Sequence, residues 1–416
     1  MERGSKYAKG SGAGMTKDSD NKHKLGDGTK AAHAGRRKEW TGAVVNPPVW
    51  RASTHLYDSE ADRKAALKSN EDGDFFYGRR GAPTQWALAQ ALTELEAGAH
   101  GTVLYPSGVA AIAGCLLTVL KPGDTLLMTD NAYDPSRSMA TGLLKRMGIT
   151  TRFLDPLELD TLPALFCDNT KAVWLESPGS LTMEVCDVPA LANIAREHGA
   201  VSMVDNTWAS SLGFAVLEHG CDIAMMSLSK HVGGHSDVMM GSASAGERWY
   251  RALRRTAQAL GHVVSPDDAA LAARGLRTMP MRLERGASGA RRIAEWLCEQ
   301  PQVERVMCPL LPTDPGHGLW SRDFSGGCGL FSFTLASQDP ETAARVVDTL
   351  ELFGIGYSWG GFESLALAIV PHEYRSVMPA PTRAGASPAI RLSIGLEEPA
   401  DLIDDLEQAL KQVIIA

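Results

Sequence analysis

Two polar side chains, Asp205 and Lys230, each follow a short apolar stretch of the chain. Residues 201–204 predict a buried strand that ends at the Asp205 carboxylate, and residues 222–229 predict a second strand that ends in two hydroxyls and the Lys230 amine. A lysine that can form a Schiff base, an acid that faces a pyridine nitrogen and hydroxyls that hold a phosphate are the groups that pyridoxal phosphate (PLP) requires. A lone lysine after a strand is usually solvated. The combination with Asp205 is therefore what predicts a PLP site.

A candidate phosphate site lies where residues 105–110 predict a turn from a strand into a helix. The free N–H groups of Gly108 and Val109, together with the helix dipole, would attract an anion. An ordinary helix N-cap is the competing interpretation of this turn. The Ser227 and Ser229 hydroxyls beside Lys230 would complete the phosphate cradle.

Three further residues before Lys230 could contact a ligand. Tyr133 follows another predicted strand and could stack on an aromatic cofactor, although simple packing is the commoner role of such a residue. Tyr77 and Arg79 are two positions apart, so in an extended segment they point the same way and could bind one anion together. A solvated surface turn would explain the same pair.

A possible substrate site lies near the C-terminus. Ser358 and Trp359 precede two glycines, which permit close approach of the backbone to a ligand but also suit a strained turn. Arg391 interrupts a predicted apolar strand, and a buried arginine needs an anionic partner. The α-carboxylate of a substrate could be that partner, although an internal salt bridge is the more common explanation.

Helix and strand patterns alternate between about residues 75 and 279, which predicts an α/β domain with a mostly parallel sheet covered by helices. Ligands in such domains bind at the C-terminal ends of the strands, where Asp205 and Lys230 are expected. After about residue 282 the pattern predicts a smaller α+β domain. The expected segments are a disordered leader (1–39), an N-terminal arm for subunit contacts (40–78), a PLP-binding α/β domain (79–280) and a C-terminal α+β domain (281–416).

The bulk properties of the 416 residues exclude several classes of protein. The formal net charge of -8 argues against nucleic acid as a partner. No apolar run approaches the roughly 18 residues that span a bilayer, so we expect no membrane segment. The seven cysteines form no CxxC pair, which predicts reduced thiols in the cytoplasm and neither a disulfide framework nor a metal site.

Residues 1–39 differ from the rest because they are rich in small and basic residues and lack hydrophobic periodicity. Arg36 and Arg37 are not followed by an apolar segment, so they do not predict a twin-arginine export signal. We interpret this region as a disordered leader, with Met15 as a candidate internal start.

From about Trp40 to the C-terminus the chain resembles the Cys/Met-metabolism PLP-dependent enzyme family. The motifs that carry the resemblance are YGRRG (77–81), LESPGSLTME (175–184), VDNTWA (204–209), GHSD (234–237), YSWGG (357–361) and IRLSIGLE (390–397). The lysine context is Ser-Leu-Ser-Lys where many relatives carry threonine before lysine, and Ser229 keeps the hydroxyl. The resemblance implies fold type I of the PLP-dependent enzymes, with a mostly parallel, seven-stranded type of sheet in the cofactor domain.

The resemblance also implies roles for individual residues. Lys230 would be the Schiff-base lysine and a catalytic residue, Asp205 the partner of the pyridine nitrogen, and Tyr133 a ring-stacking, substrate-contacting and catalytic residue. The phosphate cradle would consist of Gly108, Val109, Ser227 and Ser229, the substrate carboxylate site of Ser358, Trp359 and Arg391, and the contribution of a neighbouring subunit of Tyr77 and Arg79. The family's usual assembly is a homotetramer, a dimer of dimers with shared active sites.

The YSWGG motif favours the β-eliminating branch of this family, because γ-acting relatives resemble a Ser-Leu-Gly-Gly pattern there. The implied reaction is cleavage of L-cystathionine to homocysteine, pyruvate and ammonia in methionine biosynthesis, with cysteine desulfhydration as a side activity. A γ-acting relative, either a γ-lyase or a γ-replacement enzyme, remains the alternative.

Overall fold

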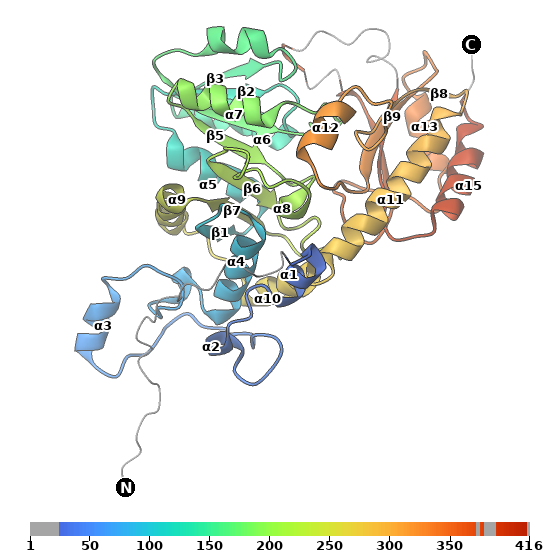
Figure 1. Cartoon of the computed structure of the whole chain (residues 1–416). Coiled ribbons are helices and arrows are strands. Elements are labelled where there is room, and N and C mark those ends of the chain that lie inside the picture. The colour runs from blue at the N-terminus through green and yellow to red at the C-terminus, as the bar shows by residue number, and fades with distance from the viewer. Residues whose placement is uncertain (1–24, 372–374, 378–387, 414–416) are drawn as a thin grey trace.

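The computed structural model describes residues 25–371, 375–377 and 388–413. These residues form two β-sheets, one of seven strands and one of five. The long helix α11 (Met279–Cys298) packs against α1 and α10 near its start and reaches the smaller sheet, as Figure 1 shows. No helix in the described ranges is both long and apolar enough to cross a bilayer.

The larger sheet is mostly parallel, because only β7 runs against its neighbours. Its strands, in spatial order, are β1 (Gly101–Tyr105), β7 (Gly241–Ala245), β6 (Ile223–Ser227), β5 (Val201–Asp205), β4 (Thr170–Glu176), β2 (Thr125–Thr129) and β3 (Thr150–Leu154). This arrangement confirms the predicted α/β fold with a seven-stranded sheet. It also aligns the C-terminal ends of β4, β5 and β6 at one edge.

Helices cover both faces of this sheet. In β2, Leu126 and Met128 pack into a core with α5 and α9, whereas Leu127 between them packs into the opposite core with α4 and α7. Strands that are buried on both faces need apolar residues at successive positions, as the sequence has here. The helices and turns around the sheet are η1 (Gly78–Arg80), α4 (Pro83–Leu95), α5 (Gly108–Val119), α6 (Asp134–Met139), η2 (Ala140–Leu144), η3 (Leu159–Leu165), α7 (Val188–Glu197), α8 (Ser210–Gly213), α9 (Glu247–Leu260) and α10 (Pro266–Leu276).

The smaller sheet follows α11 and is antiparallel except for the pairing of β10 with β11. Its strands, in spatial order, are β10 (Gly354–Ile355), β11 (Leu365–Ile369), β12 (Ala389–Ser393), β9 (Leu330–Leu335) and β8 (Val303–Met307). The remaining helices of this region are α12 (His317–Asp323), α13 (Thr342–Thr349) and α15 (Pro399–Leu410). β12 carries Arg391, so the smaller sheet supplies one of the expected site residues.

Ordered structure begins before the expected limit at residue 39. Helices α1 (Asp27–His33) and α2 (Lys38–Thr41) occupy part of the segment that we expected to be disordered. Ala31 of α1 is fully buried, and Arg277 donates hydrogen bonds of 2.7 and 2.8 Å to the carbonyls of Ala31 and Ala34. The leader prediction is therefore wrong for residues 27–39. Small alanines there lack the periodic large apolar residues that would have signalled packing. Residues 1–24 lie outside the described residues.

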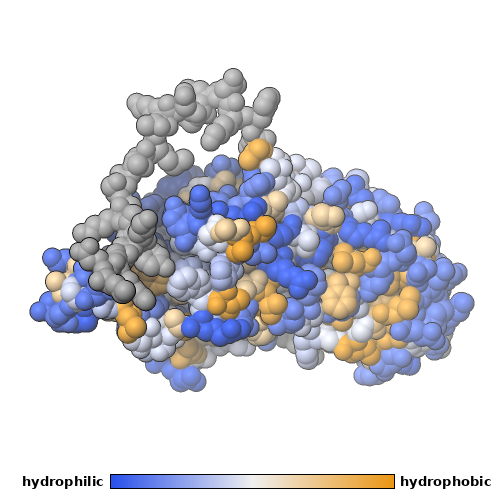
Figure 2. All heavy atoms as spheres, turned by 90° about the horizontal axis from the view of Figure 1, so that it is seen from below, coloured by the Kyte–Doolittle hydropathy of each residue, from blue (hydrophilic) through white to orange (hydrophobic). Residues whose placement is uncertain are grey.

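The expected arm, residues 40–78, contributes little to the core of its own chain. Its helix α3 (Glu60–Ala66) projects away from the sheets in Figure 1 and has no buried residue, and the Leu56 side chain is 93% exposed. Figure 2 views the chain from below and shows several exposed hydrophobic patches among polar residues on that face. The role of the arm in subunit contacts stays a prediction, as do the domain limits at residues 78 and 280.

Candidate active site

The parallel strands β4, β5 and β6 place three polar side chains side by side. Glu176 ends β4, Asp205 ends β5 and Ser227 ends β6. The Cα atoms of Glu176 and Asp205 are register partners, and Asp205 is in turn paired with Met225. The sheet therefore brings Asp205 and the turn that carries Lys230 to the same edge, as the sequence predicts.

Asp205 is a buried carboxylate that is held by a neighbouring threonine. Its Oδ1 accepts hydrogen bonds from the Thr207 N–H at 3.1 Å and the Thr207 hydroxyl at 2.5 Å. The same hydroxyl accepts the N–H of Ser227 at 2.9 Å. Burial raises the pKa of Asp205, while Thr207 and, to a lesser degree, the charge of Lys230 oppose the shift. A cation that bound here would find a carboxylate already fixed in position.

Lys230 lies in the turn after β6, with its amine directed at the loop before β11. Its Nζ donates a hydrogen bond of 2.5 Å to the Ser358 hydroxyl and lies 5.3 Å from the centroid of the Trp359 ring. Burial lowers the pKa of Lys230 to about 8, with a further lowering by Arg391 and an opposing effect of Asp205. An amine with this pKa is partly neutral near neutral pH, as a nucleophile or a base must be.

The N-terminus of α5 approaches the end of β6 closely. A Cβ atom at Gly108 would lie 2.9 Å from the Ser227 Oγ, so a side chain there would have to displace Ser227. Ser107 caps the helix by accepting the Ala110 N–H at 3.0 Å. The N–H groups of Gly108 and Val109 belong to the first turn, where helices lack internal partners. Helix N-terminus and hydroxyl together form a surface suited to a phosphate.

The Ser229 hydroxyl already has hydrogen-bond partners within the chain. Its hydroxyl accepts the Met240 N–H at 2.9 Å and donates to the Met240 carbonyl at 3.2 Å. These bonds attach the lysine turn to the segment before β7. The expected contact of Ser229 with a phosphate stays a prediction.

Tyr133 lies after β2, beside the strand-end carboxylates. Its backbone N–H donates a hydrogen bond of 2.6 Å to Glu176 Oε2. Burial raises the pKa of its phenol, the charge of Asp205 adds to the shift, and Arg391 opposes it. Tyr133 is 42% exposed, so part of its surface is accessible to a ligand. The structure thus gathers Tyr133, Asp205, Lys230 and Arg391 in one place.

Arg391 enters the site from β12. Its Nη2 donates a hydrogen bond of 3.2 Å to the Ser358 carbonyl, and burial lowers its pKa. No carboxylate lies within ion-pair distance of Arg391 in the part of the chain that the structure describes. Ser358 has a φ of 92°, a strained value for a residue other than glycine, which often marks a functional loop. A carboxylate ligand would supply the missing partner.

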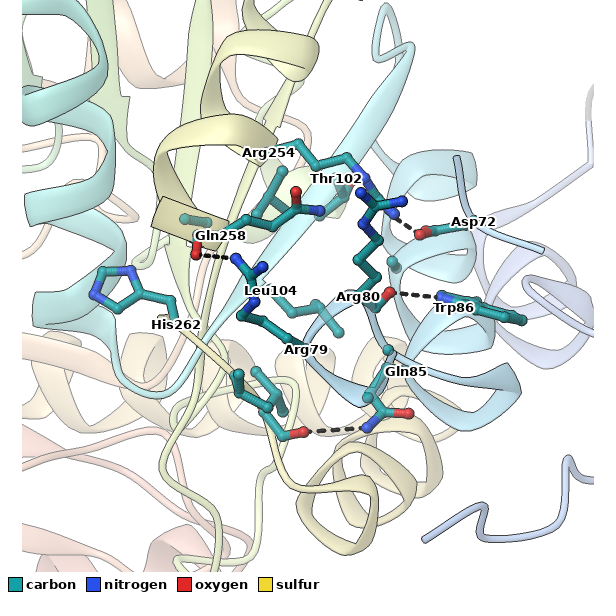
Figure 3. A pocket seen from close by; sticks show the side chains of 17 residues that line it. Asp72, Arg79, Arg80, Gln85, Trp86, Thr102, Leu104, Arg254, Gln258 and His262 are labelled. Atoms are coloured by element: carbon teal, nitrogen blue, oxygen red, sulfur yellow. Dashed lines mark hydrogen bonds and ion pairs between the residues drawn. The ribbon is translucent and has the colours of Figure 1, made fainter. Parts of the chain in front are cut away.

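The structure does not join Tyr77 or Arg79 to Lys230. Arg79 lines a pocket with Arg80 and Arg254, and its Nη1 donates a hydrogen bond of 2.6 Å to the Gln258 carbonyl, as Figure 3 shows. Neither Tyr77 nor Arg79 makes a hydrogen bond or ion pair with Lys230 among the described residues. The role of the pair in an active site therefore stays a prediction that needs a second subunit.

Two site residues escaped the analysis of the sequence. Thr207 joins Asp205 to Ser227, and Glu176 joins Tyr133 to the hydroxyl of Ser180. Glu176 is a polar residue at the end of an apolar stretch, which is the same signal that identified Asp205. Thr207 offered no such signal, because its role depends on the turn after β5.

These groups fit PLP by their chemistry. A buried carboxylate without an ion-pair partner among the described residues suits a protonated ring nitrogen, and the close contact of Gly108 with Ser227 suits a phosphate. Lys230 has the amine that the aldehyde needs. Fold and site together define a PLP-dependent enzyme of fold type I.

The chain belongs to the Cys/Met metabolism PLP-dependent enzyme family, whose model matches residues 28–411. It is 42% identical to cystathionine beta-lyase MetC of Escherichia coli over 389 residues, which cover 93% of this chain and 98% of that protein. Human cystathionine gamma-lyase is 34% identical over 388 residues, which cover 92% and 93% of the two chains. The crystal structure of metB from Corynebacterium glutamicum has a TM-score of 0.85 at 29% identity and covers 94% of this chain and 99% of its own. The resemblance drawn from the motifs is confirmed.

Proposed function

We propose that this enzyme is a carbon–sulfur β-lyase that cleaves L-cystathionine to homocysteine, pyruvate and ammonia, in methionine biosynthesis. The observation that carries the proposal is the position of the Lys230 amine. It donates a hydrogen bond to the Ser358 hydroxyl, lies over the Trp359 ring and is close enough to Arg391 for their charges to interact. The higher identity to E. coli cystathionine beta-lyase than to human cystathionine gamma-lyase supports the β-lyase assignment.

Each side chain of the site has its own role in the reaction. When bound, PLP supplies an electron sink for the electron pair released at Cα. Arg391 binds the α-carboxylate, and Lys230, with its lowered pKa, takes the α-proton. Asp205 offers a negative charge to the ring nitrogen. The Cβ–S bonding pair leaves with sulfur, which is protonated to homocysteine, and hydrolysis of 2-aminoacrylate yields pyruvate and ammonia.

Identification of the keto acid tests this function. The holoenzyme is incubated with L-cystathionine, and the products are separated by chromatography. Pyruvate with homocysteine supports the β-lyase, whereas 2-oxobutyrate with cysteine supports the γ-acting alternative. γ-Cleavage requires a second proton to leave Cβ, so it depends on finer placement of Lys230 and Tyr133. Sulfide released from L-cysteine would reveal the desulfhydrase side activity.

We also propose a homotetramer, a dimer of dimers in which Tyr77 and Arg79 complete the site of a neighbouring subunit. The support is that neither residue makes a hydrogen bond with Lys230 among the described residues, and that Tyr77 belongs to the arm, which has exposed apolar side chains. Mixing inactive Lys230→Ala subunits with inactive Arg79→Ala subunits should restore part of the activity, because some sites would then hold both intact residues. No recovery after confirmed subunit exchange would refute the shared site.

A cytoplasmic location is the last part of this proposal. All seven cysteines are free thiols, and burial raises the pKa of each of the five buried ones, Cys115, Cys186, Cys221, Cys308 and Cys328. Buried neutral thiols persist in a reducing compartment. Fractionation of the source cells should place the lyase activity with the cytoplasmic enzymes.

A further inference from the structure

Glu176 connects two loops of the site. Its Oε2 accepts the backbone N–H of Tyr133 at 2.6 Å, and its Oε1 accepts the Ser180 hydroxyl at 2.6 Å. Tyr133 lies in the loop after β2, and Ser180 lies in the loop after β4. One carboxyl group at the end of β4 therefore holds both loops.

The same two loops also contact each other directly through Asn131. Ser180 donates its N–H to the Asn131 carbonyl at 2.9 Å, two residues before Tyr133. A Cβ atom at Gly179 would lie 2.2 Å from Asn131 Nδ2, so no side chain fits there. Because the two loops already contact each other closely, we expect a change at Glu176 to reach the backbone of Tyr133.

The surroundings of Glu176 disfavour its charge. Burial raises its pKa, and the neighbouring Asp205 carboxylate raises it further, while hydrogen bonds and the charge of Arg375 oppose the shift. No lysine or arginine forms an ion pair with Glu176 among the residues described. Glu176 offers the site two carboxyl oxygens, and each of them accepts a hydrogen bond, one from Tyr133 and one from Ser180.

We propose that Glu176 is a positioning residue for the cofactor, which acts through its hydrogen bonds and not through its charge to hold the Tyr133 backbone so that the phenol lies against bound PLP. The inference rests on the proposed role of Tyr133 as the ring-stacking residue. In this role Glu176 neither pairs with a charge nor contacts the substrate.

The experiment measures the dissociation constant of PLP from the apoprotein of three variants. Glu176→Ala should weaken PLP binding about tenfold, since it leaves the Tyr133 N–H without its acceptor. Glu176→Gln, a neutral residue of the same shape, should stay within about twofold of the wild type and keep the visible circular dichroism of the bound cofactor. Glu184→Ala, which removes a carboxylate from the same loop without touching Tyr133, should also stay within about twofold.

A double-mutant cycle separates positioning from general damage. If Glu176 acts through Tyr133, adding Glu176→Ala to Tyr133→Ala should weaken PLP binding no further. Additive losses, or equal losses in Glu176→Gln and Glu176→Ala, would overturn the inference alone. Unchanged affinity in Tyr133→Ala would instead refute the stacking role and the inference with it. Should Glu176→Ala fail to fold, Glu176→Asp, which withdraws the carboxyl by one methylene, replaces it with the same expected loss.

Discussion

Asp130 and Asp205 both lie where a parallel strand of the larger sheet ends, and both are buried. Asp130 forms a 2.7 Å ion pair with Arg137 and accepts the N–H groups of Ser376 and Val377 at 2.8 to 3.0 Å. Asp205 accepts hydrogen bonds only from Thr207, and no cation forms an ion pair with it among the described residues. A carboxylate that holds the chain together is thus neutralised by the chain itself, whereas a carboxylate kept for a ligand is not.

The same contrast separates the arginines of the two regions. Arg137 and Arg375 engage acidic groups within the protein, at Asp130 and Glu184 respectively. Arg391 engages only the Ser358 carbonyl among the described residues. The site therefore contains an anionic group, Asp205, and a cationic group, Arg391, that have no ion-pair partner among the described residues, which is the electrostatic pattern of a binding site for a zwitterion and a cationic ring.

Lys230→Ala should have the largest effect on activity. Removal of the positioned base should lower turnover of L-cystathionine by ~10² to 10⁴-fold, since that is the usual contribution of one acid–base group. The apoprotein should keep its thermal midpoint. Borohydride reduction of the wild type should bleach its visible absorbance and leave a modified peptide that contains Lys230. If borohydride reduction still labelled the variant, the cofactor would be bound to another lysine, and the assignment of Lys230 would be wrong.

Asp205→Asn should follow, with turnover about 10²-fold lower, because a neutral amide cannot stabilise the charge on the ring nitrogen. The amide oxygen can still accept from Thr207. The variant should therefore fold at least as well as the wild type without cofactor, since a buried group with a raised pKa is removed. Steady-state kinetics and calorimetry of the apoprotein check the two parts. Near-normal turnover would show that Asp205 is structural, like Asp130.

Asp130→Asn should show the opposite pattern. One partner of a buried ion pair is lost, which should lower the free energy of unfolding by about 2 kcal/mol, less than for a fully buried pair because Arg137 keeps some exposure. Activity per folded molecule should change little. Urea unfolding followed by circular dichroism measures the loss. If the variant were as stable as the wild type but inactive, the distinction between the two aspartates would fail.

The sequence predicts this contrast only in part. Apolar stretches that end in polar residues identify β5 and β6, and hence Asp205 and Lys230. Strand β7, Gly-Ser-Ala-Ser-Ala, is not predicted because its small residues have no hydrophobic pattern, although it is fully buried between β1 and β6. Two of the groups that bind Asp130, the backbone N–H groups of residues 376 and 377, come from far along the chain. Long-range contacts of this kind leave no local signal.

A third buried carboxylate, Glu96, extends the comparison because no lysine or arginine among the described residues forms an ion pair with it. It caps the C-terminal end of α4, and burial raises its pKa to about 8 against the opposing hydrogen bond from the Leu217 backbone. Its Oε1 has no hydrogen-bond partner among the described residues. We therefore expect Glu96 to be accommodated in its protonated form.

The pH dependence of stability tests this last case. Because the folded pKa of Glu96 lies above its unfolded value of 4.5, its protonated form contributes stability that is complete below pH 4.5 and is lost as the pH rises toward 8. Glu96→Gln cannot ionise, so its thermal midpoint should match that of the wild type at about pH 4 and exceed it increasingly up to about pH 8, with activity unchanged. A difference that does not vary with pH would mean that Glu96 is ionised in the folded protein. Burial alone would then not require a carboxylate in this chain to be paired with a cation or protonated.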